Sequence, residues 1–237
     1  MEKQERLNRI ACLRSHIKQG TLIREQYMSE DEQGRSTACL LAALSPEAGM
    51  AEDPAMCPAD LMPLWMAHLT PWIDDRGTND PWPSVVRKYA SLASRWHVLN
   101  DEQWEAARRA VVRAILRPVH RVFPQLHNSV SELLDSAFTS ELLDSAITDP
   151  LAPPLKSVVY SRTVDIAARD RVAESAVREL ARFSLKSAFG ATPMVHAVAV
   201  TRLIGGHKVN HRDLIYDEMI EDILNILEDR IALAEGA

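Results

Sequence analysis

Glycine and tyrosine are scarce in this sequence, and runs of alternating β-branched residues are nearly absent. Its 237 residues include 8 glycines and 4 tyrosines, whereas alanine, leucine, arginine and glutamate are plentiful. Strands favour β-branched and aromatic side chains in alternation, so this composition argues against a fold built on sheets. We therefore predict an all-α fold, an irregular multi-helix bundle of roughly eight to ten helices. Residues 21–35 are ambiguous and allow one short extended hairpin.

Cysteine pairs and long apolar runs are also missing. The 3 cysteines, Cys12, Cys39 and Cys57, form no CxxC pair, which excludes a zinc ribbon and a thioredoxin-type motif. Residues 1–8 are charged and lack the apolar segment of a signal peptide. Residues 194–204 form a dense apolar run, but a spanning helix needs roughly 20 such residues. We expect a cytoplasmic protein that makes no membrane contact.

The motifs that mark well-known catalytic sites are absent. We find no phosphate-binding P-loop, dinucleotide-binding glycine turn, GxSxG elbow or HExxH helix. His207 and His211 are spaced as a metal-binding pair, but the motif has no glutamate and spans the expected start of a helix. We therefore predict no metal and no cofactor. These absences favour a non-enzymatic role in protein interaction or scaffolding, with another protein or a second copy of the chain as partner.

One basic feature interrupts an acidic chain, whose formal net charge is -6. Four arginines spaced by four residues share one face of a predicted helix: Arg109, Arg113, Arg117 and Arg121. This Arg stripe suits contact with phosphate groups or with an acidic partner. It also suits internal docking, because the excess negative charge lies entirely beyond residue 124. A stripe without interleaved aromatic residues is weak evidence for nucleic-acid binding.

All five tryptophans fall within a Trp-rich segment, residues 65–104. One hypothesis is a pocket for a small ligand or a substrate, lined by aromatic rings and polar groups. Its candidate residues are Trp65, His68, Trp72, Asp74, Asp75 and Trp96. The other hypothesis is that the tryptophans anchor proline-broken loops. A deep cavity lined by Trp65, Trp72 or Trp96, with His68 or an aspartate in it, would favour the pocket.

Turn and capping residues predict where the helices begin and end. We expect helices over residues 2–19, 38–44, 63–69, 81–97, 101–122 and 211–234, among others. Gly20 marks the end of the first helix, and Ser36 or Thr37 would cap the second. Pro63 and Pro71 bracket the third, Asp80 would cap the fourth, and Asn100 with Gln103 would form a capping box at the start of the fifth.

The second half contains a tandem duplication, a strong break and an amphipathic last helix. Residues 131–139 are nearly repeated as 140–148, for which we assign no role. The proline-rich break at residues 149–154 predicts two subdomains, 1–148 and 149–237, packed as one unit. The last helix carries an apolar seam of Ile220, Ile223, Leu227 and Ile231. It could pack inside its own chain, the interpretation we favour, or against another subunit.

Overall fold

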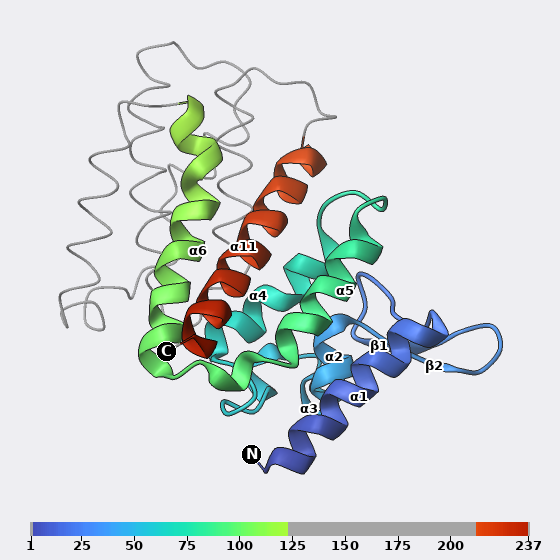
Figure 1. The fold of residues 1–237 in the computed structure, drawn as a ribbon. Helices are drawn as coiled ribbons and strands as arrows, with labels where there is room; N and C mark the ends of the chain where they lie inside the picture. The colour runs from blue at the N-terminus through green and yellow to red at the C-terminus, as the bar shows by residue number, and fades with distance from the viewer. Residues whose placement is uncertain (1, 123–211, 237) are drawn as a thin grey trace, which may run out of the picture. The chain divides into compact units, whose positions relative to one another are not determined.

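The computed structural model defines residues 2–122 and 212–236, and these ranges confirm the all-α fold with one short hairpin. Figure 1 shows the arrangement of the elements. The α-helices in these ranges are α1 Lys3–Gln19, α2 Leu40–Leu44, α3 Pro46–Ala51, α4 Leu64–Asp75, α5 Trp82–Ala93, α6 Asp101–Val122 and α11 Arg212–Glu235. The strands are β1 Met28–Glu30 and β2 Ser36–Ala38, and the short 3₁₀ helices are η1 Pro54–Met56 and η2 Trp96–Val98.

Contacts between Cα atoms divide the chain into two compact units. Residues 1–111 group with residues 216–237, and residues 112–215 form the second unit. The predicted boundary after residue 148 lies outside the described residues and stays a prediction. The duplication at 131–148, the break at 149–154 and the His207–His211 pair also lie outside them.

The first helix ends where the sequence predicts. Gly20 adopts a left-handed conformation, with φ of 64°, and its N–H bonds to the last turn of α1. Ile10 and Leu13 are buried, whereas Leu7, also on the expected apolar stripe, is half exposed. Arg9 completes the docking of α1, because its guanidinium forms an ion pair with Glu47 of α3 at 2.6 Å.

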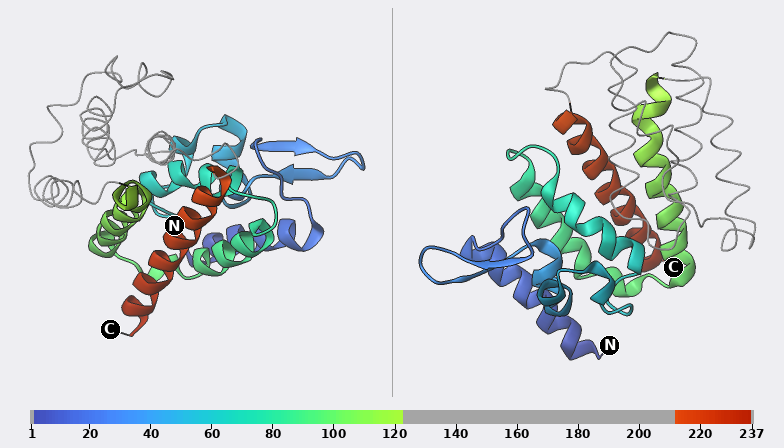
Figure 2. Two further views of the ribbon diagram at one scale, coloured as in Figure 1. Left: turned by 90° about the horizontal axis from the view of Figure 1, so that it is seen from above. Right: turned by 180° about the vertical axis from the view of Figure 1, so that it is seen from behind.

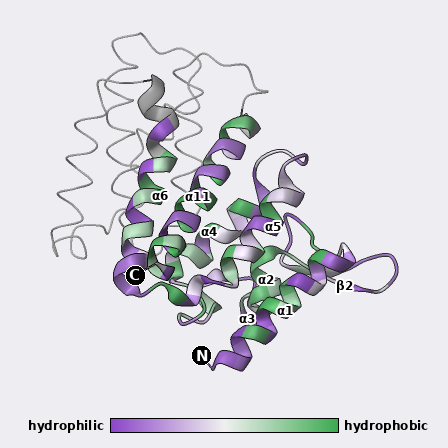
Figure 3. Ribbon diagram, in the orientation of Figure 1, coloured by the Kyte–Doolittle hydropathy of each residue, from purple (hydrophilic) through white to green (hydrophobic). Residues whose placement is uncertain are grey.

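The hairpin lies slightly later in the chain than the sequence suggests. β1 pairs antiparallel with β2, with Met28 opposite Ala38, and both views of Figure 2 show the hairpin projecting from the helices. Ser36 and Thr37 are therefore strand residues, and the predicted helix cap at these positions is wrong. Cys39 caps α2 instead, because its Sγ accepts a hydrogen bond from the N–H of Ala42. Every residue of α2 is buried, in keeping with its apolar colour in Figure 3.

The bounds of α4 and α5 also differ from the prediction, and α5 ends at Ala93 and not near residue 97. α4 continues through Pro71, where the sequence predicts an end, and reaches Asp75. Proline removes one helical hydrogen bond, but the buried residues on both sides of it, such as Leu69 and Ile73, hold the helix together by packing. The expected Asp80 cap does not form, because Pro81 occupies the N-cap of α5, and no side-chain hydrogen bond caps this helix.

The capping box at the start of α6 is confirmed. The N–H of Asn100 donates to the side chain of Gln103, and the N–H of Gln103 donates to the side chain of Asn100, both at 2.9 Å. These reciprocal bonds fix the start of the helix that carries Trp104.

The apolar seam of the last helix is buried. All four residues of its apolar seam are at most 2% exposed, which agrees with packing inside the chain. Its acidic residues meet basic ones from the region of α5: Lys88 pairs with Glu228, and Arg95 pairs with Glu235. The charge that would make this helix repel a copy of itself is thus partly neutralised within the chain.

Candidate functional site

Four aromatic side chains from four elements form a continuous row in the first unit. Tyr89 of α5 meets Trp96 of η2 with ring centroids 5.3 Å apart, and Trp96 meets Trp104 of α6 at 5.9 Å. Trp104 in turn meets Trp65 of α4 at 6.0 Å. Each pair is close to perpendicular, with interplanar angles of 75–85°, the edge-to-face geometry that aromatic rings prefer. We call Trp65, Trp96 and Trp104 the Trp cluster.

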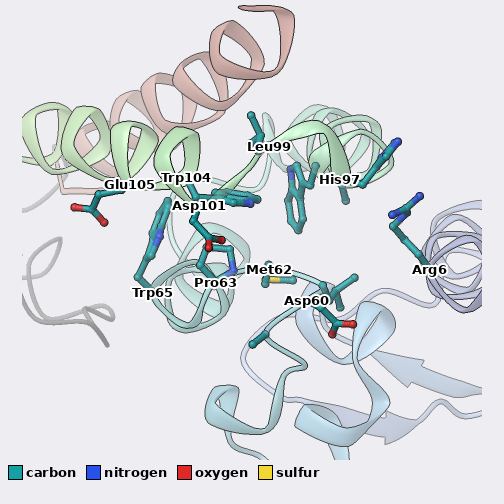
Figure 4. A pocket seen from close by; sticks show the side chains of 14 residues that line it. Arg6, Asp60, Met62, Pro63, Trp65, His97, Leu99, Asp101, Trp104 and Glu105 are labelled. Atoms are coloured by element: carbon teal, nitrogen blue, oxygen red, sulfur yellow. The ribbon is translucent and has the colours of Figure 1, made fainter. Parts of the chain in front are cut away.

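A cavity of about 340 Å³ opens beside the Trp cluster. Figure 4 shows its lining, with Trp65 and Trp104 on one side and Arg6, reaching from α1, on the opposite side. Its lining residues are Trp65, Trp96, Trp104, Ala59, Leu61, Met62, Pro63, Ala93, Leu99, Arg6, Asp60, His97, Asp101 and Glu105. A volume of this size suits a small organic molecule.

Trp96 stands out among the lining residues. The residue is 2% exposed, and its indole N–H has no hydrogen-bond partner in the part of the chain that the structure describes. The comparable groups nearby are satisfied: the hydroxyl of Tyr89 bonds to that of Thr70 at 2.8 Å, and the indole N–H of Trp82 donates to Asp74 at 2.9 Å. An unpaired buried donor costs roughly 1–3 kcal/mol. This donor is shielded from solvent and stays unpaired within the packed aromatic row.

The charged lining residues are mostly acidic. The lining contains three carboxylates, those of Asp60, Asp101 and Glu105, and one guanidinium, that of Arg6. Glu105 is already engaged, because Arg108 lies 3.5 Å and Arg109 lies 3.8 Å from its carboxylate. In Figure 4 Glu105 points away from the centre of the cavity. Asp101, by contrast, makes no side-chain hydrogen bond or ion pair with any residue that the structure describes.

The structure places two of the six candidate pocket residues at the cavity and four away from it. Trp65 and Trp96 line the cavity, but His68, Trp72, Asp74 and Asp75 do not. Trp72 lies under the guanidinium of Arg76, 4.5 Å from its ring centroid. These four candidate residues belong to α4 but lie outside the lining of the cavity.

Asp74 is a buried structural carboxylate. It is fully buried and accepts hydrogen bonds from the N–H of Leu40 and the indole N–H of Trp82, both at 2.9 Å. These donors favour the charged form, but desolvation outweighs them and raises the pKa of Asp74 to about 7. Asp74 thereby ties α4 to the starts of α2 and α5.

Asp75 has a similar linking role. Its carboxylate accepts a hydrogen bond from the N–H of Glu25 at 2.6 Å, and burial raises its pKa. Glu25 has a left-handed backbone with φ of 65°, a conformation that costs a non-glycine residue roughly 1–3 kcal/mol. The hydrogen bond that Glu25 donates to Asp75 holds this loop in place before β1.

Three of the four arginines of the Arg stripe are described, and all three already interact within the protein. Arg109 lies near Glu105, and Arg113 and Arg117 also interact with other groups of the protein. The side chain of Arg121 is outside the described set. The stripe therefore offers less to a polyanion than its spacing suggests.

Several lining residues carry no signal in the sequence. Arg6 belongs to the first helix, and Asp60, Leu61, Met62 and Pro63 belong to a loop with no motif. They reach the Trp cluster only through tertiary packing. Trp104 carries a detectable signal, because it belongs to the Trp-rich segment and follows the capping box of α6.

Comparison with known proteins identifies no relative. No family model matches the chain, and no curated protein or solved structure is significantly similar to it. Within residues 2–122 and 212–236, no three histidine, cysteine or acidic side chains gather as a metal site. None of the described helices is long and apolar enough to cross a bilayer.

Proposed function

We propose that this protein binds a small organic molecule in the cavity beside the Trp cluster. The observation that carries the proposal is the cavity of about 340 Å³, whose lining combines the Trp cluster with charged side chains such as Arg6 and Asp101. Apolar walls with a few polar groups are typical of sites for small molecules. A ligand there would gain apolar contacts with the lining and polar contacts with these charged groups.

Binding is better supported than catalysis at this cavity. No serine, threonine, cysteine, lysine or tyrosine lines it, so the usual nucleophiles are missing from its described walls. His97, Asp101 and Glu105 could move protons, but among the described residues no hydrogen bond joins any of these three to another lining residue in the way that activates a base. We therefore propose a receptor or carrier of a small molecule.

The scaffold role and the anion-binding Arg stripe stay predictions from the sequence. The arginines whose side chains are described already interact within the protein, which weakens the second. A protein-interaction role is compatible with ligand binding, since a ligand that fills the cavity would stiffen the junction of α4, η2 and α6.

Native mass spectrometry of the full chain, purified from its own host, tests the proposal. We expect the wild-type protein to retain a small molecule that is released on denaturation. Trp96→Phe replaces a lining indole by a smaller ring and so reshapes one wall of the cavity, and this variant should retain less of that molecule. Trp72→Phe is the matched control, because Trp72 lies outside the cavity, and it should retain as much as the wild type.

A parallel thermal-shift screen with small organic fragments covers a ligand lost during purification. Fragments that stabilise the wild type and the Trp72→Phe variant, but stabilise Trp96→Phe less, would support the proposal. An empty mass spectrum together with no stabilising fragment would overturn it. Equal effects on both variants would place binding elsewhere in the chain and would also overturn it.

A further inference from the structure

Three methionine side chains lie exposed on neighbouring elements of the first unit. Met28 of β1, Met50 of α3 and Met56 of η1 are each at least 41% exposed, whereas the other methionines of the described ranges are buried. Met28 lies over Gly49 of α3, because a β-carbon on that glycine would come within 2.8 Å of the Met28 sulfur. η1 in turn packs against α3. We call Met28, Met50 and Met56 the Met patch.

Methionine is suited to a surface that meets another protein. Its side chain is unbranched and polarizable, so it adapts to the irregular apolar surface of a partner. Single exposed apolar residues are common, whereas a group of them on packed elements marks a contact surface. The other exposed large apolar residues of the described chain are spread over α1, α4 and α11: Leu7, Leu64, Leu214 and Leu233.

The charges beside the Met patch are negative. Glu30 shares a face of β1 with Met28, since alternate residues of a strand point to the same side. Glu52 is the C-cap of α3. Burial raises the pKa of Tyr27, and the charge of Glu52 adds to the rise, so the start of β1 lies close to the end of α3. Neither Glu30 nor Glu52 has an ionic or hydrogen-bonded side-chain partner among the described residues.

The nearby cations are already paired. Arg35, in the turn of the hairpin, pairs with Asp31 at 2.7 Å, and Arg9 of α1 pairs with Glu47 of α3 at 2.6 Å. The described part of the chain therefore leaves an apolar surface with an acidic border, and positive charge from outside would complement that border.

A partner has to match the apolar and the acidic parts together. We propose that the Met patch docks an amphipathic helix of another protein, with basic residues along the edge of its apolar face. A helix presents both kinds of residue on adjacent faces, whereas an extended segment turns alternate residues to opposite sides. A second copy of this chain would bring its own acids against Glu30 and Glu52 and be repelled. The proposal does not depend on the cavity, because no residue of the Met patch lines it.

Two designed peptides of opposite charge test the proposal. The peptide LKKLLKLLKKLLKL places leucines on one helical face with lysines beside them, and LEELLELLEELLEL replaces each lysine by glutamate. Calorimetric titration of the full chain should find the basic peptide bound at least about tenfold more tightly than the acidic one. Hydrogen peroxide oxidises exposed methionines, so mass spectrometry can locate the contact. Bound basic peptide should slow the oxidation of Met50 and Met56 by about fivefold or more.

Variants separate the apolar contact from the charge. Met50→Gln combined with Met56→Gln keeps size and charge but removes the apolar surface, and it should weaken the basic peptide about tenfold. Leu233→Gln, an exposed apolar site on α11, is the matched control and should change the affinity less than about twofold.

The acidic border is tested in the same way. Glu30→Gln combined with Glu52→Gln should weaken the basic peptide about fivefold. Glu221→Gln removes an exposed charge from α11 and should change the affinity less than about twofold.

Three results would overturn the proposal. The first is that the basic peptide does not bind. The second is that control and patch variants lose affinity equally, which would mean attraction to the overall negative charge. The third is a wild-type dimer that the paired methionine variant dissociates, which would assign the Met patch to a second copy of the chain.

Discussion

Asp217 of α11 accepts two hydrogen bonds from Thr78, one from its N–H and one from its hydroxyl, each 2.8 Å long. The two residues are 139 positions apart, so this contact fixes the last helix to the loop between α4 and α5. Gly77 precedes Thr78 with a left-handed φ of 83°, and a β-carbon there would overlap Oδ1 of Asp217. The conformation of the loop and the position of α11 are therefore coupled through this glycine.

Gly77→Ala should destabilise the protein more than Gly34→Ala, because the two sites share a positive φ but differ in their surroundings. Nothing lies within 4 Å of a β-carbon at Gly34, whose φ is 71°. That substitution should cost about 1 kcal/mol of unfolding free energy, measured by urea denaturation. Gly77→Ala should cost about 2 kcal/mol more, since it also disturbs the hydrogen bonds to Asp217. In an Asp217→Ala background this excess should vanish, and equal costs in the wild-type background would refute the coupling.

The buried carboxylate of Asp74 should make stability fall as the pH rises. Its pKa in the folded chain is about 7, above the unfolded value of 3.8, so the folded state keeps a proton that the unfolded state has lost. The stability is fully present below about pH 4 and declines up to about pH 7, by on the order of 4 kcal/mol.

Asp74→Asn removes this titration while keeping the shape of the side chain. Asparagine can accept from only one of the two N–H donors, so the variant is less stable than the wild type at pH 5. That deficit should shrink by several kcal/mol at pH 8, where the wild type has lost its advantage. Urea denaturation of both proteins at the two pH values measures the difference. A deficit that grows between pH 5 and pH 8 would mean that the two donors, not burial, govern the pKa of Asp74.

The three cysteines should react with a thiol reagent at very different rates. Cys12 is exposed, whereas Cys39 and Cys57 are buried and have pKa values raised by desolvation to about 11. At pH 8 roughly one in a thousand of the buried thiols would be ionised, and the thiolate is the reactive form. The native wild type should therefore be labelled once per chain on a minutes timescale, and Cys12→Ser not at all. Rapid labelling of Cys12→Ser would show that the region around α2 opens readily.

Local signals predict much of this fold from sequence, because they depend on residues within one turn of each other. Gly20 ends α1, and the reciprocal bonds of Asn100 and Gln103 start α6, as their types and spacing indicate. The helix cap predicted at Ser36 or Thr37 is wrong because strand pairing with β1 recruits both residues. Tertiary pairing overrides a capping preference worth only about 1 kcal/mol.

The candidate site was less predictable, because its parts come from distant segments. The Trp-rich segment contributes Trp65 and Trp96 to the lining of the cavity. Composition alone does not separate Asp74, which packs as a structural group, from Asp101, which faces the cavity. That distinction depends on which side of each helix meets its neighbours, and single-residue patterns do not encode it.

The apolar seam of α11 should behave as core. Ile223 and Leu227 are fully buried, so Ile223→Ala should cost about 2–5 kcal/mol of unfolding free energy. Leu233→Ala is the matched control on the same helix, because Leu233 is 65% exposed, and it should change stability by no more than about 0.5 kcal/mol. The double variant Ile223→Glu, Leu227→Glu should lose the folded state altogether, since two charges would be buried without partners. Circular dichroism and light scattering on the same samples measure both effects. A double variant that stays folded but halves in mass would instead show that the seam joins two copies of the chain.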